Sequence, residues 1–101
     1  MALYTLEKSS NTKKKYMITI ISKKTNRQRT KHFGANGMSD FTIHKDQARK
    51  QRYINRHKSN EDWTDAETSS FYSRWVLWNL PSLKNSWNDT KAKLKSMSYI
   101  K

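Results

Sequence analysis

All four tryptophans of this chain, at positions 63, 75, 78 and 87, lie in its second half, whereas nearly all of its excess positive charge lies in its first half. Residues 8–58 carry fifteen Lys and Arg against two acids, and residues 59–101 carry six against five. A chain of 101 residues can bury only a small core. The division therefore predicts an aromatic back half that packs and a basic front half that meets an anionic partner.

The front half contains the signals of a β-hairpin, which we place at residues 15–22 and 28–34. The stretch "YMITIISK" is rich in β-branched and aromatic residues, and the more polar "QRTKHF" follows the turn-like "KTNR". Apolar residues alternate onto both faces of the first strand, which predicts that both faces are covered. The earlier "ALYTLEK" fits either a short edge strand or an arm.

Three helices are expected after the hairpin, near residues 46–58, 69–79 and 81–97. Asp46 is a good N-cap, which would start the first of them at Gln47. Large apolar residues in "SFYSRWVLWN" form the stripe of a short buried helix, and Pro81 ends that helix or opens the next.

These elements predict a small single domain of the α+β class, with an N-terminal β-hairpin followed by three short helices. The domain is expected to span residues 15–101. Residues 1–14 would be an N-terminal arm and a basic linker, because "SSNTKKK" is polar and typical of a flexible connection.

The tryptophans of the back half allow three interpretations. Trp75 and Trp78 recur at helical spacing beside Val76 and Leu77, which favours packing in the core. Aromatic rings of this kind can also stack on the bases of a single strand. They can equally act as anchors in a protein interface, where Trp, Tyr and Arg are enriched.

A row of basic residues in "HKDQARKQRYINRH" is the main candidate for a binding site. Lys45, Arg49, Arg52 and Arg56 follow the spacing i, i+4, i+7 and i+11, which places them along one side of a helix. The row would be about 16 Å long. It could be a solvated face that is partly paired with the acids of residues 61–67. Arginine, however, suits bidentate contacts with carboxylate or phosphate, which favours a partner.

The helix that carries this row has little apolar surface of its own. Only Ala48, Tyr53 and Ile54 could face a core, so the sequence predicts that the helix is weakly held within its domain. A second group of candidate partner-binding residues is the basic linker, which contains the three consecutive lysines Lys13, Lys14 and Lys15.

Several functional classes are disfavoured by the residues. There is no cysteine, and the three histidines lack the spacing of a zinc site, so we expect no metal. No nucleophile elbow, phosphate-binding loop or dinucleotide fingerprint occurs, so we expect no enzyme, cofactor or small-molecule substrate. The apolar runs are too short to cross a bilayer and the N-terminus lacks a secretory signal, which predicts a soluble intracellular protein.

The stretches "KHFG", "DFTIHKD", "RKQRYINRHK", "EDW" and "FYSRWVLWNLPSL" resemble a group of small basic proteins of nucleocytoplasmic large DNA viruses, the giant viruses and their relatives. Their pattern is H-F-G, D-F-T-x-H-K-D, R-K-x-R-Y-x-x-R-H, W and F-W-S-R-W-L-L-W-N-x-P-[ST]-L, and the resemblance covers residues 31–83. This chain departs from it at Gln47, Ser70 and Tyr72, where Pro, Gly and Trp are usual.

The resemblance implies a viral origin and a location in the virion, with host cytoplasm as the place of assembly. It implies a structural role, as a minor capsid or capsid-associated protein that bridges larger capsid subunits. The alternative, which the charge of +13 keeps open, is a basic nucleic-acid-binding protein that packages or organises viral DNA or binds RNA.

Overall fold

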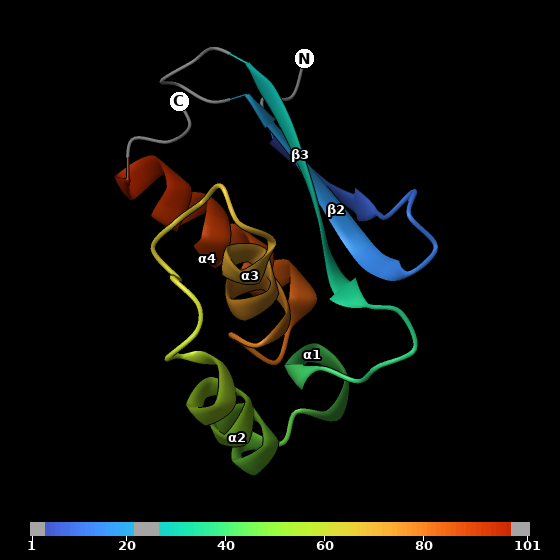
Figure 1. Cartoon of the computed structure of the whole chain (residues 1–101), viewed down its shortest axis with the longest axis vertical. Coiled ribbons are helices and arrows are strands. Elements are labelled where there is room, and N and C mark those ends of the chain that lie inside the picture. The colour runs from blue at the N-terminus through green and yellow to red at the C-terminus, as the bar shows by residue number, and fades with distance from the viewer. Residues whose placement is uncertain (1–3, 22–26, 98–101) are drawn as a thin grey trace.

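The computed structural model describes residues 4–21 and 27–97, and their arrangement confirms a small α+β domain (Figure 1). Three strands form one antiparallel sheet in the order β1-β2-β3: β1 Tyr4–Lys8, β2 Lys14–Ile21 and β3 Gln28–Ala35. The predicted hairpin is therefore present as β2 and β3, except that residue 22 lies outside the described residues. The segment for which the sequence allowed a strand or an arm is the edge strand β1, which pairs with β2.

The described residues after the sheet form helices joined by loops. The predicted three are present as α2 Gln47–His57, as α3 Ser69–Tyr72 continuing into the π-helix η1 Ser73–Leu77, and as α4 Leu83–Ser96. A short helix that the sequence did not predict, α1 Phe41–His44, lies between the lower end of the sheet and α2 in Figure 1. Four residues are too few to produce a helical periodicity in the sequence.

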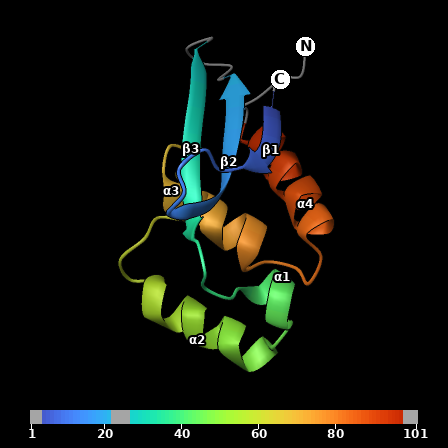
Figure 2. The ribbon, with the colours of Figure 1, turned by 90° about the vertical axis from the view of Figure 1, so that its right-hand side faces the viewer.

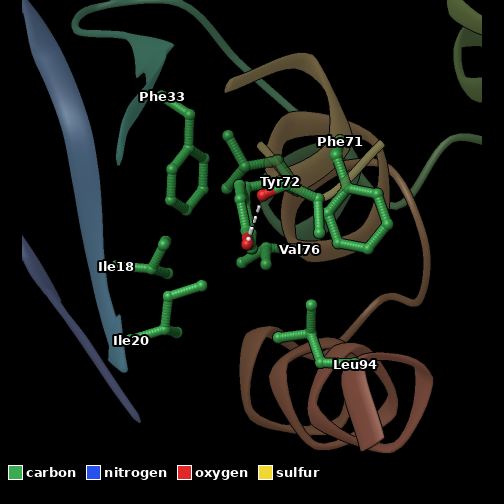
Figure 3. Packing of buried hydrophobic residues seen from close by; sticks show 9 residues of the cluster. Ile18, Ile20, Phe33, Phe71, Tyr72, Val76 and Leu94 are labelled. Carbon is green, nitrogen blue, oxygen red and sulfur yellow. Dashed lines mark hydrogen bonds between the residues drawn. The ribbon is translucent and has the colours of Figure 1, made fainter. Parts of the chain in front are cut away.

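The hydrophobic core lies between one face of the sheet and the helices α3, η1 and α4. Figure 3 shows Ile18, Ile20 and Phe33 of the sheet facing Tyr72 and Val76. The Tyr72 hydroxyl, although buried, donates a hydrogen bond of 2.8 Å to the Ala66 carbonyl, so its polar group is satisfied. Tertiary packing of this kind stabilises helices that are too short to persist alone.

The opposite face of the sheet has no helix over it in Figures 1 and 2. Met17, Thr19 and Ile21, which alternate with the buried residues of β2, remain partly exposed. Within residues 4–21 and 27–97, the prediction that both faces of β2 are covered is therefore wrong. An antiparallel sheet can leave one face in water, and here β2 does so despite its apolar pattern.

The packing interpretation of the tryptophans is confirmed for three of them. Trp75, Trp78 and Trp87 are partly buried and pack against the core cluster. The backbone of Gly34 also packs closely against this cluster. A Cβ added at Gly34 would lie 2.6 Å from Leu77 Cδ1. Gly34 has a φ of 76°, so a side chain is disfavoured by both space and backbone conformation.

Candidate partner-binding surface

Helix α2 forms as the sequence predicts. The Asp46 carboxylate accepts hydrogen bonds from the backbone N–H groups of Ala48, at 2.9 Å, and Arg49, at 3.3 Å, so Asp46 is the N-cap and Gln47 the first helical residue. This satisfies two of the amide groups that lack a partner at the start of a helix. The helix ends at His57, where the Lys58 N–H donates to the Ile54 carbonyl.

The inner side of α2 is held by stacked aromatic rings. The Tyr53 ring lies 4.4 Å from the Trp78 ring with an angle of 1° between their planes, and 4.4 Å from the His57 ring. Trp63 is also near parallel to Tyr53, at 6.4 Å. Burial of Tyr53 raises its pKa, so the phenol stays neutral. Ala48 is exposed and Ile54 only partly buried, so Tyr53 does most of the packing that the sequence divided among three residues.

Lys50 forms a second attachment on this inner side. Its Nζ donates a hydrogen bond of 2.6 Å to the Asn79 carbonyl and lies 4.9 Å from the centre of the Phe41 ring. Burial lowers the pKa of Lys50, and the nearby charge of Arg74 lowers it further. Lys50 therefore stabilises the position of α2 and is separate from the exposed basic row.

Arg49, Arg52 and Arg56 lie along one side of α2, next to the buried Tyr53, and all three are exposed. They span about 10 Å at ~1.5 Å per residue. In the part of the chain that the structure describes, none of the three forms an ion pair. We name these three residues the arginine row.

The acids that follow α2 are engaged elsewhere. Glu61 contacts His57 Nδ1 at 2.9 Å and accepts a hydrogen bond from Trp63 Nε1, and Glu67 lies 3.8 Å from Arg29. Asp62 and Asp65 accept backbone N–H groups of their own turns. The acids of residues 61–67 therefore do not pair with the arginine row, contrary to one of the two interpretations of the sequence. The row is left available to a partner.

Lys45 does not belong to the row. It is the C-cap of α1, with a left-handed φ of 55°, and its Nζ donates to the Thr42 carbonyl at 3.0 Å. The sequence spacing placed Lys45 in register with the arginines because it extended one helix across the junction. The chain instead changes direction at this residue, between α1 and α2.

The three lysines of the basic linker, Lys13, Lys14 and Lys15, also differ in their exposure. Lys13 and Lys14 are exposed, the first in the turn after β1 and the second at the start of β2. Lys15 is partly buried, and its Nζ lies 2.5 Å from the carboxylate of the buried Asp40. Lys15 therefore links β2 to the N-terminus of α1, and its charge is neutralised inside the domain.

One basic residue of this region was missed by sequence reasoning. Arg74 on η1 packs its guanidinium against the rings of Trp75, at 4.2 Å, and Trp63, at 5.3 Å, and donates to the Trp78 carbonyl. Burial lowers its pKa. The signal was available, because an arginine inside the apolar run "SRWVLW" must find partners within the fold.

No three His, Asp or Glu side chains in residues 4–21 and 27–97 gather closely enough to hold a metal ion. None of the described helices has the length and apolar character needed to cross a bilayer. The surface that remains is a short helix with exposed guanidinium groups, which can form paired hydrogen bonds with carboxylates or phosphates.

Comparison with known proteins matches part of the chain to a family. The model of a family of unknown function, DUF5754, matches residues 4–57, which contain the sheet, α1 and α2. The match thus includes both groups of basic residues predicted from the sequence. No curated protein and no solved structure shows significant similarity to the chain.

Proposed function

Since the chain belongs to the DUF5754 family of unknown function, we propose its function from its own side chains. The protein is a non-enzymatic structural component of a virus particle, a minor capsid or capsid-associated protein. It bridges larger capsid subunits by binding a carboxylate-rich protein surface with Arg49, Arg52 and Arg56. The observation that carries this proposal is the exposure of all three arginines on a helix whose inner side is docked, with no acid of the described chain pairing with them.

The docking of α2 favours a partner with a defined shape. The sequence alone suggested a weakly held helix, and in the structure the Tyr53 stack and the Lys50 hydrogen bond dock α2 on the rest of the domain. A helix that is docked before binding loses less freedom than a mobile one, and a guanidinium can match two carboxylate oxygens at once. Figures 1 and 2 show α2 at the end of the molecule away from the sheet, where a large subunit can reach it.

Binding to nucleic acid is the second candidate. It is favoured by the net charge of +13 together with the lack of any described carboxylate on the arginine row. Sequence-independent binding to phosphate depends on charge, however, and lysine serves it nearly as well as arginine. This difference allows the two candidates to be separated by a substitution that keeps the charge.

The test is the triple substitution Arg49→Lys, Arg52→Lys and Arg56→Lys, introduced into the virus. We expect this variant to be depleted from purified particles about tenfold or more, and a short duplex DNA to be retained nearly as well as by the wild type. A matched control, Lys84→Arg with Lys95→Arg on α4, should enter particles normally. Gentle disassembly of wild-type particles should release the protein with the shell fraction.

The opposite result identifies the second candidate. If the Lys variant enters particles normally and only a triple change to Glu is excluded, the row acts as a diffuse positive patch. If the protein also leaves with the genome, and its DNA affinity falls with a log–log salt slope of about 0.9 per phosphate contacted, nucleic acid is the partner.

A further inference from the structure

A groove that none of the three arginines lines lies between the sheet and α1. Its volume is about 620 Å³, and its lining includes Lys8, Tyr16, Gly37, Met38 and Ile43. It therefore joins the ends of β1 and β2 to the loop before α1 and to α1 itself. In Figure 1 this region is where the chain passes from the lower end of β3 into α1.

Two exposed aliphatic side chains line this groove. Met38 is 65% exposed and Ile43 is 62% exposed, and among the described residues no other large hydrophobic side chain reaches these fractions. Leu80 and Met97, the next most exposed, are at 37% and 40%. Single exposed apolar residues are common on protein surfaces, but neighbouring ones that line one hollow mark an interaction site.

Hydrogen bonds fix the loop that exposes Met38. The Met38 N–H donates to the Ala35 carbonyl at 3.2 Å, and Gly37 supplies the left-handed φ of 87° that the turn requires. Asn36 binds the turn after β1 twice, through its N–H to the Lys13 carbonyl and through its side-chain amide to the Thr12 carbonyl, both at 2.9 Å. Met38 is thus held outward by an ordered turn.

Ile43 is fixed in a similar way. Asp40 caps α1 by accepting from the Thr42 N–H and hydroxyl, and Phe41 is buried on the inner side of the same helix. With Phe41 turned inward, Ile43 is left in solvent. The short helix α1 therefore presents the aliphatic side chain of Ile43 to the groove. The polar groups of Thr42 are bonded to the capping residues Asp40 and Lys45.

The charge around the groove is positive. Lys8 is exposed at the rim and forms no ion pair with any described residue. Lys13 is exposed on the adjoining turn, and Lys14 is exposed at the start of β2. No carboxylate lines the groove. The nearby Asp40 is 2% exposed, and it is neutralised by Lys15. A ligand in this groove would contact the side chains of Met38 and Ile43 and the positive charge of Lys8 at the rim.

We propose that this groove is a second docking surface, which binds a segment of a partner protein carrying a large apolar side chain next to Asp or Glu. Met38 and Ile43 would contact the apolar side chain, because methionine adapts to varied shapes and apolar anchors dominate protein interfaces. Lys8 would pair with the carboxylate. A nucleic acid fits this groove less well, because Tyr16 is the only aromatic residue that lines the groove and could stack on a base.

This inference goes beyond the proposed function and does not rest on the arginine row. With two separate surfaces, one small domain can hold two neighbouring subunits. The probe is a phage-displayed library of short random peptides, selected on the whole purified chain. Recovered peptides are then synthesised, and their affinities are measured for the wild type, Met38→Ser, Ile43→Ser and Lys8→Glu. Leu80→Ser, at an exposed leucine outside the groove, is the matched control.

We expect the recovered peptides to share an aliphatic or aromatic residue beside acids. Their dissociation constants should rise about tenfold or more with each groove variant. The dissociation constants should be unchanged in Leu80→Ser and in the triple Arg-to-Lys variant of α2. A negative result for the arginine row would therefore contradict only the proposed function and not the groove. Thermal melts of Met38→Ser and Ile43→Ser should match the wild type, since both side chains are exposed.

Three results would overturn the proposal. The first is that no peptide is enriched, and the second is that enriched peptides lack the apolar and acidic pair or bind Ile43→Ser as tightly as the wild type. The third is that the groove variants weaken retention of a short duplex DNA while peptide binding is unaffected, which would make the groove part of a nucleic-acid surface.

Discussion

Tyr53 is the residue on which the position of α2 depends most, because it is the only residue of that helix that is buried. Its ring lies flat against Trp78 and near His57 and Trp63, so a single side chain connects α2 to the residue that follows η1 and to the acidic segment. Aromatic pairs of this geometry contribute beyond the area that they bury.

Replacing Tyr53 with Ala should therefore lower the free energy of unfolding by ~3 kcal/mol, since the lost ring leaves a cavity beside Trp78. Tyr53→Phe keeps the stacked ring and should retain most of the stability. Chemical denaturation followed by tryptophan fluorescence measures both. Equal stabilities of the Ala and Phe variants would show that the stack does not hold α2.

His44 makes the stability depend on pH. Its Nδ1 accepts the Asp46 N–H at 2.9 Å, its Nε2 is buried without a hydrogen-bond partner, and its ring lies 5.3 Å from that of Trp78. Burial, followed by the charge of Arg49, lowers the pKa of His44 below its ordinary value of 6.5. The folded protein therefore favours the neutral imidazole.

The sign of the effect follows from this shift. The unfolded chain takes up a proton at His44 near pH 6.5, whereas the folded chain resists it, so stability is fully present above pH 6.5 and is lost as the pH falls through the folded pKa. His44→Asn keeps a hydrogen-bond acceptor but removes the titrating group. Between pH 7 and pH 5 the melting temperature of the wild type should fall more than that of His44→Asn. Parallel curves would contradict this.

At the level of elements, the N-cap of α2 can be tested separately from its packing. Asp46→Ala removes the acceptor of the Ala48 and Arg49 N–H groups and should cost about 1 kcal/mol. Asp46→Asn retains a capping oxygen and should cost less. Urea unfolding measures the free energy of unfolding of the wild type and both variants. An Asp46→Ala variant as stable as the wild type would show that the cap does not stabilise the domain.

The elements that the sequence predicts well are those with local signals. Asp46 marks the start of α2, and alternating β-branched residues mark β2. The sequence did not predict α1, because its four residues depend on the Asp40 cap and on burial of Phe41 by distant parts of the chain. Missing α1 also misplaced Lys45, whose left-handed backbone interrupts the helical spacing.

The candidate site shows the same limit. The spacing of Arg49, Arg52 and Arg56 predicted that they lie along one side of a helix, and the structure places all three, exposed, on α2. The ion pair of Lys15 with Asp40 joins residues 25 positions apart, and the outward position of Ile43 depends on α1. Such relations arise from tertiary contacts, which local patterns do not encode.

At the scale of the whole molecule, a net charge of +13 on 101 residues repels itself in the folded state. Salt screens this repulsion over about 10 Å at 0.1 M. The melting temperature should therefore rise when NaCl is raised from about 10 mM to physiological strength. The triple substitution of the arginine row with Gln lowers the charge by three and should make the rise smaller. Melts that do not respond to salt would contradict this.

Because Tyr53 is the only buried residue of α2, we expect this helix to open at a lower free-energy cost than the sheet and the helices over it. Regions with few buried contacts open locally at a small fraction of the free energy of global unfolding. A partner that binds the folded α2 adds its own binding free energy to this weakest part of the domain. Amide hydrogens of α2 should then exchange quickly in the free protein and slowly in the assembled one, so that binding itself completes the rigidity of the helix.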